Sequence, residues 1–224
     1  MNRRTGVNLV TLFGLLSVGA LPFATGCTTA YYGTMEKFGQ HKRDILKSRI
    51  EAGRKDQEYA QDQFKTTYER FSEASGYDGG DFESVYNDLN REYERSEARA
   101  ADVTNRIASI ETVAADLFEE WQAELDLIQS AKLRGASAES LRITKGRYSE
   151  LITAMKRAEA KMPPVLTAFR DQVLFLKHSL NARAIAALEG TLGEMESDVA
   201  SLIRDIDVSI REAERFLQTL DSEA

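Results

Sequence analysis

Apolar and small residues recur along most of this chain at alternating steps of four and three, the spacing of one face of a helix. A helical pattern begins near Thr34, the first such run covers residues 46–74, and a second, more regular run covers residues 82–128. Between them lies GYDGGD, residues 76–81, whose three glycines and two aspartates predict a turn, with Asp81 as the N-cap of the following helix. Two long helices joined by so short a turn must run antiparallel, folded about residues 78 and 79.

The second half of the chain predicts further helices. A break is expected at KLRGASAES, residues 132–140, with Ser137 as the next N-cap. A third helix then leads to Pro163 and Pro164, a pair that starts or kinks the next helix because proline suits only the first turn. Regular stepping resumes over residues 188–220, and no strand-like alternation occurs in the sequence. The pattern predicts an all-α fold, an elongated antiparallel helical bundle with long, coiled-coil-like helices.

One stretch, residues 165–188, is apolar nearly all round and is therefore expected to be buried by several neighbours. Its polar minority includes Arg170, Asp171, His178 and Asn181, and the stepping places His178 and Asn181 on the core stripe. These four residues are candidates for a buried polar site inside the bundle. The alternative is that the histidine and the asparagine form a core pair that fixes helix register. Asp171 and His178 are about 10 Å apart along one helix, so they are not a contacting dyad.

The first 26 residues have a different character. Arg3 and Arg4 are followed by a long uncharged, apolar run, then by small residues, and then by Cys27, the only cysteine. A charged start, an apolar run and a small-residue end are typical of a secretory signal peptide, which predicts cleavage after residue 26. Two alternatives stay open: a transmembrane anchor, since about 20 apolar residues span a bilayer, and a signal-peptide cysteine that is never modified.

The stretch LPFATGCTT, residues 21–29, resembles the bacterial lipoprotein signal, in which cleavage precedes a cysteine that receives lipid. Thr25 and Gly26 fit the two positions before the cut, whereas Ala24 replaces the leucine most common there. The resemblance implies that Cys27 is the site of lipid attachment. Threonine rather than aspartate after the cysteine implies delivery to the outer membrane, facing the periplasm of a Gram-negative bacterium.

The expected organisation is a cleaved signal peptide over residues 1–26, a short tether over 27–33 and a helical bundle domain over 34–222. Cleavage would remove two arginines and leave 27 basic and 36 acidic side chains, a net charge of −9. This balance argues against binding of nucleic acid or of anionic lipid by bulk charge. A lone cysteine and two histidines predict no metal site and no cofactor. GYDGGD has half the length of an EF-hand loop, so we expect a simple turn there rather than a calcium site.

A second resemblance covers most of the chain. It is carried by FRDQVLFLKHSLNARAIAAL, residues 169–188, by AMKRAEAKMPPVL, residues 154–166, and by the YDGGD turn. Together they resemble an uncharacterised bacterial family of helical lipoproteins, domain of unknown function 2959, over roughly residues 31–217. The resemblance implies fold and location, and it carries no assigned activity and no catalytic residue.

A lipid anchor followed closely by long helices predicts a non-catalytic envelope protein, a scaffold or partner-binding module rather than an enzyme. Its expected partners are the membrane, through lipidated Cys27, and envelope proteins or further copies of itself, with no nucleic acid. One alternative is an elongated bundle that shapes membranes, which needs a basic stripe on one face. Another is a small-ligand-binding bundle, which needs a cavity lined by Arg170, His178 and Asn181.

Overall fold

The structure, a computed structural model, describes residues 27–222, with side chains over residues 42–221. The chain divides into two compact units, Met1–Glu36 and Lys37–Ala224. Four long helices make up the described residues: α1 (Cys27–Ser75), α2 (Phe82–Leu125), α3 (Ala131–His178) and α4 (Ala182–Ser222). Residues 27–36 of the first unit are helical and belong to α1. No strand occurs among residues 27–222, and the predicted all-α fold is confirmed.

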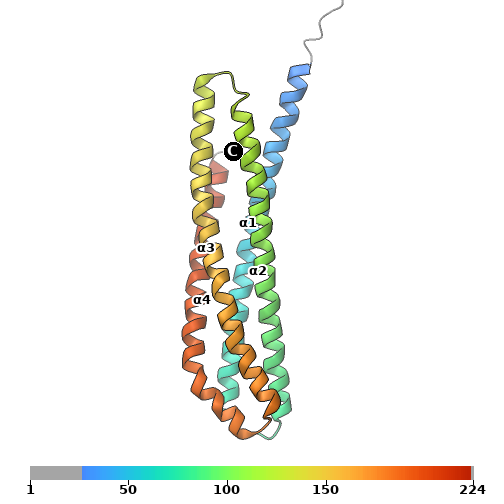
Figure 1. The fold of residues 1–224 in the computed structure, drawn as a ribbon, viewed down its shortest axis with the longest axis vertical. Coiled ribbons are helices and arrows are strands. Elements are labelled where there is room, and N and C mark those ends of the chain that lie inside the picture. Colours follow the sequence, from blue (N-terminus) through green and yellow to red (C-terminus); the bar gives the residue numbers. More distant parts are fainter. Residues whose placement is uncertain (1–26, 223–224) are drawn as a thin grey trace, which may run out of the picture. The chain divides into compact units, whose positions relative to one another are not determined.

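Within the second unit the four helices form an antiparallel bundle (Figure 1). Their connections are short, residues 76–81, 126–130 and 179–181, which makes each helix run opposite to the next. The first and third connections lie at one end of the bundle and the second at the other (Figure 1). The side-chain amide of Gln61 on α1 donates to the Asp207 carboxylate on α4 at 2.7 Å, so α4 lies beside α1 and closes the bundle.

The core is built from the apolar stripes that the sequence pattern predicts. Aromatic rings cross it near both ends: Phe71 stacks on Phe169 with ring centroids 5.3 Å apart, and Tyr148 lies between Phe118 at 5.4 Å and Phe216 at 6.1 Å. These contacts join α1 to α3 at one end and α2, α3 and α4 at the other. Burial of such rings and of the leucines and isoleucines between them supplies the main driving force for helix association.

The turn at residues 76–81 is confirmed. The Asp81 carboxylate accepts a hydrogen bond from the Ser84 N–H at 3.0 Å and caps α2. The Tyr77 hydroxyl oxygen accepts from the Asp81 N–H at 3.2 Å, and the Tyr77 ring packs edge-on against Phe82. The turn therefore has its own cap and its own small apolar contact.

The register of the α1–α2 hairpin differs from the symmetric fold about residues 78 and 79. Gly53 lies against Ile110, and Thr67 hydrogen-bonds Ser96, so the two helices pair about residue 81 instead. The turn is asymmetric because Tyr77 folds over Gly79 and holds the backbone of residue 81. By these two contacts the partner on α2 is shifted by six residues, somewhat less than two helical turns.

The second break lies earlier than predicted. α2 ends at Leu125, and Ser130, not Ser137, caps α3 by accepting from the Leu133 N–H at 3.4 Å. The expected break at residues 132–140 is therefore wrong. Ser137 lies within α3, and its hydroxyl accepts a hydrogen bond from the indole N–H of Trp121 on α2 at 2.9 Å.

α3 continues through Pro163 and Pro164, so the prediction that this pair starts a new helix is wrong. Each proline removes one backbone donor from the helix. Both proline side chains are exposed, whereas the adjacent Met162 and Val165 are almost completely buried. Burial on either side of the pair holds the helical conformation against the loss of two hydrogen bonds.

Candidate functional site

Cys27, the predicted lipid attachment residue, is the first residue of α1. Residues 28–33, expected to be a tether, are helical and belong to the same helix. The predicted signal peptide, residues 1–26, lies outside the described residues, as does the Cys27 side chain. Lipid attachment there stays a prediction. Between residues 27 and 222, no helix is long and apolar enough to span a bilayer.

The four residues of the predicted buried polar site are all exposed. Arg170 and Asp171 are neighbours on α3, with the guanidinium Nε 3.8 Å from the carboxylate. His178 is the last residue of α3. The Asn181 side-chain oxygen accepts from the Ala184 N–H at 3.1 Å and caps α4. The prediction of a buried site is wrong, and so is the alternative of a register-fixing core pair.

The reason is a helix break that the sequence pattern does not signal. α3 ends at His178, and residues 179–181 form a short connection in which the Ser179 N–H donates to the Leu176 carbonyl. The apolar stepping traced back from Leu188 therefore stops at Ala184 and Ile185, which are buried. The polar residues beyond them belong to a turn and a cap, where Asn side chains are favoured.

Other polar side chains do lie in the core, at positions that interrupt the apolar stripes. Among the side chains of residues 42–221, five are fully buried: Gln57, Thr67, Ser96, Thr144 and Ser209. The Thr67 and Ser96 hydroxyls are 2.8 Å apart, and Thr67 also donates to the Glu92 carbonyl at 3.2 Å. Gln57 has no hydrogen-bond partner for either atom of its amide, and the Ser209 hydroxyl has none. The spacing alone could have identified these positions as buried.

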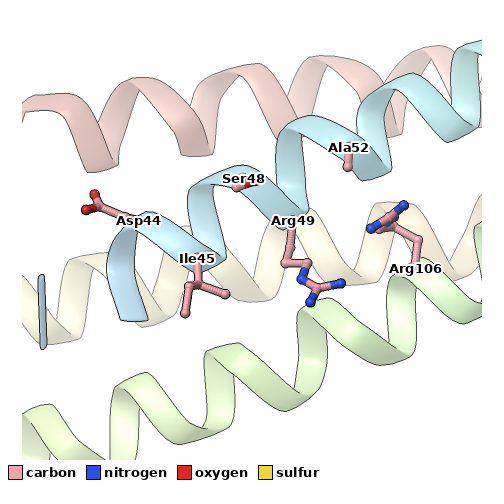
Figure 2. A pocket seen from close by; sticks show the side chains of 6 residues that line it. All are labelled: Asp44, Ile45, Ser48, Arg49, Ala52 and Arg106. Atoms are coloured by element: carbon pink, nitrogen blue, oxygen red, sulfur yellow. The ribbon is translucent and has the colours of Figure 1, made fainter. Parts of the chain in front are cut away.

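A surface groove of about 450 Å³ runs between α1 and α2 (Figure 2). Its lining residues are Asp44, Ile45, Ser48, Arg49 and Ala52 of α1 and Arg106 of α2. Arg49 extends from α1 and Arg106 from α2 (Figure 2). The Arg106 guanidinium lies 2.7 Å from the Asp56 carboxylate, which neutralises it. With Asp44 also on the rim, the groove has no excess of positive charge to select an anion.

Burial shifts the pKa of two groups on α2 and α3, Tyr148 and Glu124. Burial, followed by the nearby Glu111 carboxylate, raises the pKa of Tyr148 to about 12. Burial also raises the pKa of Glu124, with Glu120 adding to the effect and Lys42 opposing it. Neither group is joined by a nucleophile or a base in a cleft, so these shifts reflect packing. Over the part of the chain that the structure describes, no cluster of three or more His, Cys, Asp or Glu side chains could hold a metal ion.

Comparison with known proteins gives one result. Residues 31–220 match the family described as "Protein of unknown function (DUF2959)". No curated protein matches the chain significantly. The matched range includes the turn at residues 76–81, the proline pair of α3 and the α3–α4 connection, and it agrees with the resemblance inferred from the sequence. Because the match covers most of its length, the chain belongs to the DUF2959 family of proteins of unknown function.

Proposed function

We propose that this protein is a lipid-anchored, non-catalytic helical scaffold of the cell envelope. Cys27 would carry the lipid, and the bundle would face the periplasm from the outer membrane of a Gram-negative bacterium. The feature that supports the proposal is the stretch LPFATGCTT, residues 21–29, in which small residues directly precede Cys27, the only cysteine of the sequence.

The helices suit a scaffold because they offer long continuous surfaces. α2 has 44 residues and α3 has 48, which at 1.5 Å per residue gives lengths of about 66 and 72 Å. Many charged side chains pair with a neighbour three or four residues along the same helix, as Arg142 does with Glu139. Such pairs keep a surface soluble and contribute little to stability, so they leave it available for partners.

Membrane shaping is a second candidate because α3 is basic, with ten Lys and Arg against four Asp and Glu. Several of these cations join the bundle together, however. Lys156 pairs with Glu111 of α2, and Arg157 and Lys161 both pair with Asp205 of α4. Deformation of anionic liposomes by the unlipidated protein would favour this candidate. The small-ligand alternative loses its basis because Arg170, His178 and Asn181 are exposed.

The test is in-cell crosslinking with mass spectrometry, on the wild type, on Cys27→Ala and on Thr28→Ala as a matched control. The wild type and the control should be recovered with membranes and crosslinked to envelope proteins. Cys27→Ala should lose membrane recovery and those crosslinks while it keeps its helical circular dichroism. Recovery of the wild type in the soluble fraction, or a Cys27→Ala variant that behaves as the wild type, would contradict the proposal.

A further inference from the structure

Three large apolar side chains are exposed together near the α3–α4 connection. Leu174 and Phe175 are each 45% exposed at the end of α3, and Leu180 in the connection is 42% exposed. We call these three residues the ridge. Single exposed apolar residues are common on soluble proteins, but a group of them within seven residues indicates a surface that is covered by a partner.

In the first turns of α4, exposed small residues recur along one side of the helix, bordered by Arg183, Glu189 and Glu194. They recur at helical spacing and are all exposed: Ala182, Ala186, Gly190, Gly193 and Ser197. We call this set the strip. A Cβ atom built at Gly190 or at Gly193 would have nothing within 4 Å, so packing inside this chain does not require glycine there. Each glycine nevertheless costs the helix about 1 kcal/mol relative to alanine, and its lack of a side chain allows close approach by another molecule.

The ridge and the strip lie at the same level of the bundle. Lys161 of α3 contacts both Ser201 and Asp205 of α4, which fixes the register of this antiparallel pair. Phe175 lies fourteen residues beyond Lys161 towards the connection, and residues 187 and 191 lie fourteen residues from Ser201 and Asp205 in the same direction. Phe175 is therefore level with residues 187–191 of α4. The ridge and the strip therefore lie at the same level on two neighbouring helices. A two-fold axis parallel to the helices would set the ridge of each copy against the strip of the other.

Charge supports the same arrangement. Glu189, Glu194 and one cation, Arg183, border the strip, and Lys177 adjoins the ridge; all four are exposed. Along their whole lengths, α3 has ten basic and four acidic residues, whereas α4 has four basic and nine acidic. A pairing of α3 with α4 of a second copy is thus electrostatically complementary, while a pairing of α3 with α3 is repulsive.

We propose that the α3–α4 face is a homodimer interface and that its occupant is a second copy of this chain. The ridge of each copy packs on the strip of the other, with Lys177 near Glu189 or Glu194 of the second copy. This interface does not depend on the proposed function.

The first test is the molar mass of the full chain, purified in mild detergent, by light scattering over a concentration series. Twice the chain mass is expected. The double variant Gly190→Gln, Gly193→Gln should fold, because both side chains have open space, and should raise the dimer dissociation constant at least tenfold. The control Ala101→Gln, on an exposed face of α2, should leave the constant unchanged. A monomeric wild type at every concentration would overturn the proposal, and so would an unaltered constant in the double variant.

The second test places the contact. Two Cys27→Ala chains, one with Phe175→Cys and the other with Gly190→Cys, are mixed and treated with a short bismaleimide. Only a contact between copies gives the mixed crosslink, which is expected here, and Lys65→Cys on α1 in place of Gly190→Cys should give none. A crosslink that is equally strong with Lys65→Cys would overturn the proposal. Because these chains lack Cys27, the result is independent of lipid anchoring.

Discussion

Replacement of Gln57 by methionine should make the protein more stable. Gln57 is completely buried on α1, and neither the donor nor the acceptor of its side-chain amide has a hydrogen-bond partner. Methionine has nearly the same length and volume, so it keeps the packing while it removes the polar groups.

The expected magnitude follows from the cost of unpaired polar groups. A buried donor or acceptor without a partner costs about 1 to 3 kcal/mol. With both amide atoms of Gln57 unpaired, Gln57→Met should raise the free energy of unfolding by about 2 to 4 kcal/mol. For a chain of 150 to 250 residues, each kcal/mol raises Tm by about 2 to 4 °C, so the gain should be at least about 4 °C.

Gln61→Met is the matched control, one turn further along α1. The Gln61 amide donates to the Asp207 carboxylate at 2.7 Å, a bond to a charged group that joins α1 to α4. Its loss should lower the free energy of unfolding by about 1 to 3 kcal/mol. Urea unfolding followed by circular dichroism measures both variants, and unchanged m-values show that the compactness of the unfolded state is unaltered.

Opposite signs for the two glutamine variants are therefore the predicted result. A loss of stability in Gln57→Met would refute the reasoning, because it would mean that the amide makes favourable hydrogen bonds in the folded protein. A shift of the same sign in both variants would equally refute it.

Three further predictions concern other buried positions. Burial raises the pKa of Tyr148 to about 12, so its neutral form stabilises the fold below pH 10, and this contribution is lost as pH rises from 10 to 12. In urea unfolding at pH 9 and 11.5, Tyr148→Phe should lose less stability between the two pH values than the wild type does. Gly53→Leu should lower the free energy of unfolding by about 2 to 3 kcal/mol, because its Cβ would lie 2.9 Å from a buried side chain of α2. Gly146→Ala, in open space, should raise the free energy of unfolding by about 1 kcal/mol in the same measurement. Thr67→Val and Ser96→Ala should each cost about 1 to 3 kcal/mol, and the double variant should cost less than their sum because the two hydroxyls bond to each other.

The hairpin of α1 and α2 could be predicted from the sequence because its signals are local and agree. GYDGGD concentrates glycine and aspartate between two long apolar stripes, and Asp81 is both a turn residue and a cap. The other two connections, residues 126–130 and 179–181, contain neither glycine nor proline. Their positions depend on single caps, Ser130 and Asn181, and on packing of the flanking helices, which composition does not show.

The prediction of a buried polar site was wrong because composition does not signal the helix break at residues 179–181. The apolar stripe of α4 was extended through the break at residues 179–181, so His178 and Asn181 were placed in the core when they lie in a last turn and a cap. At Pro163 and Pro164 the error was the opposite: a new helix was predicted where α3 continues. Burial of Met162 and Val165 outweighs the loss of the two backbone donors. Gln57, in contrast, falls at a core position by spacing alone, since the regular stripe on both sides fixes its face.

The mass of the N-terminal peptide of the protein recovered from cells tests the central claim most directly. The account predicts a chain that begins at Cys27 and carries the added mass of acyl groups on that residue. A chain that retains residues 1–26, or one that begins at an unmodified Cys27, would contradict it.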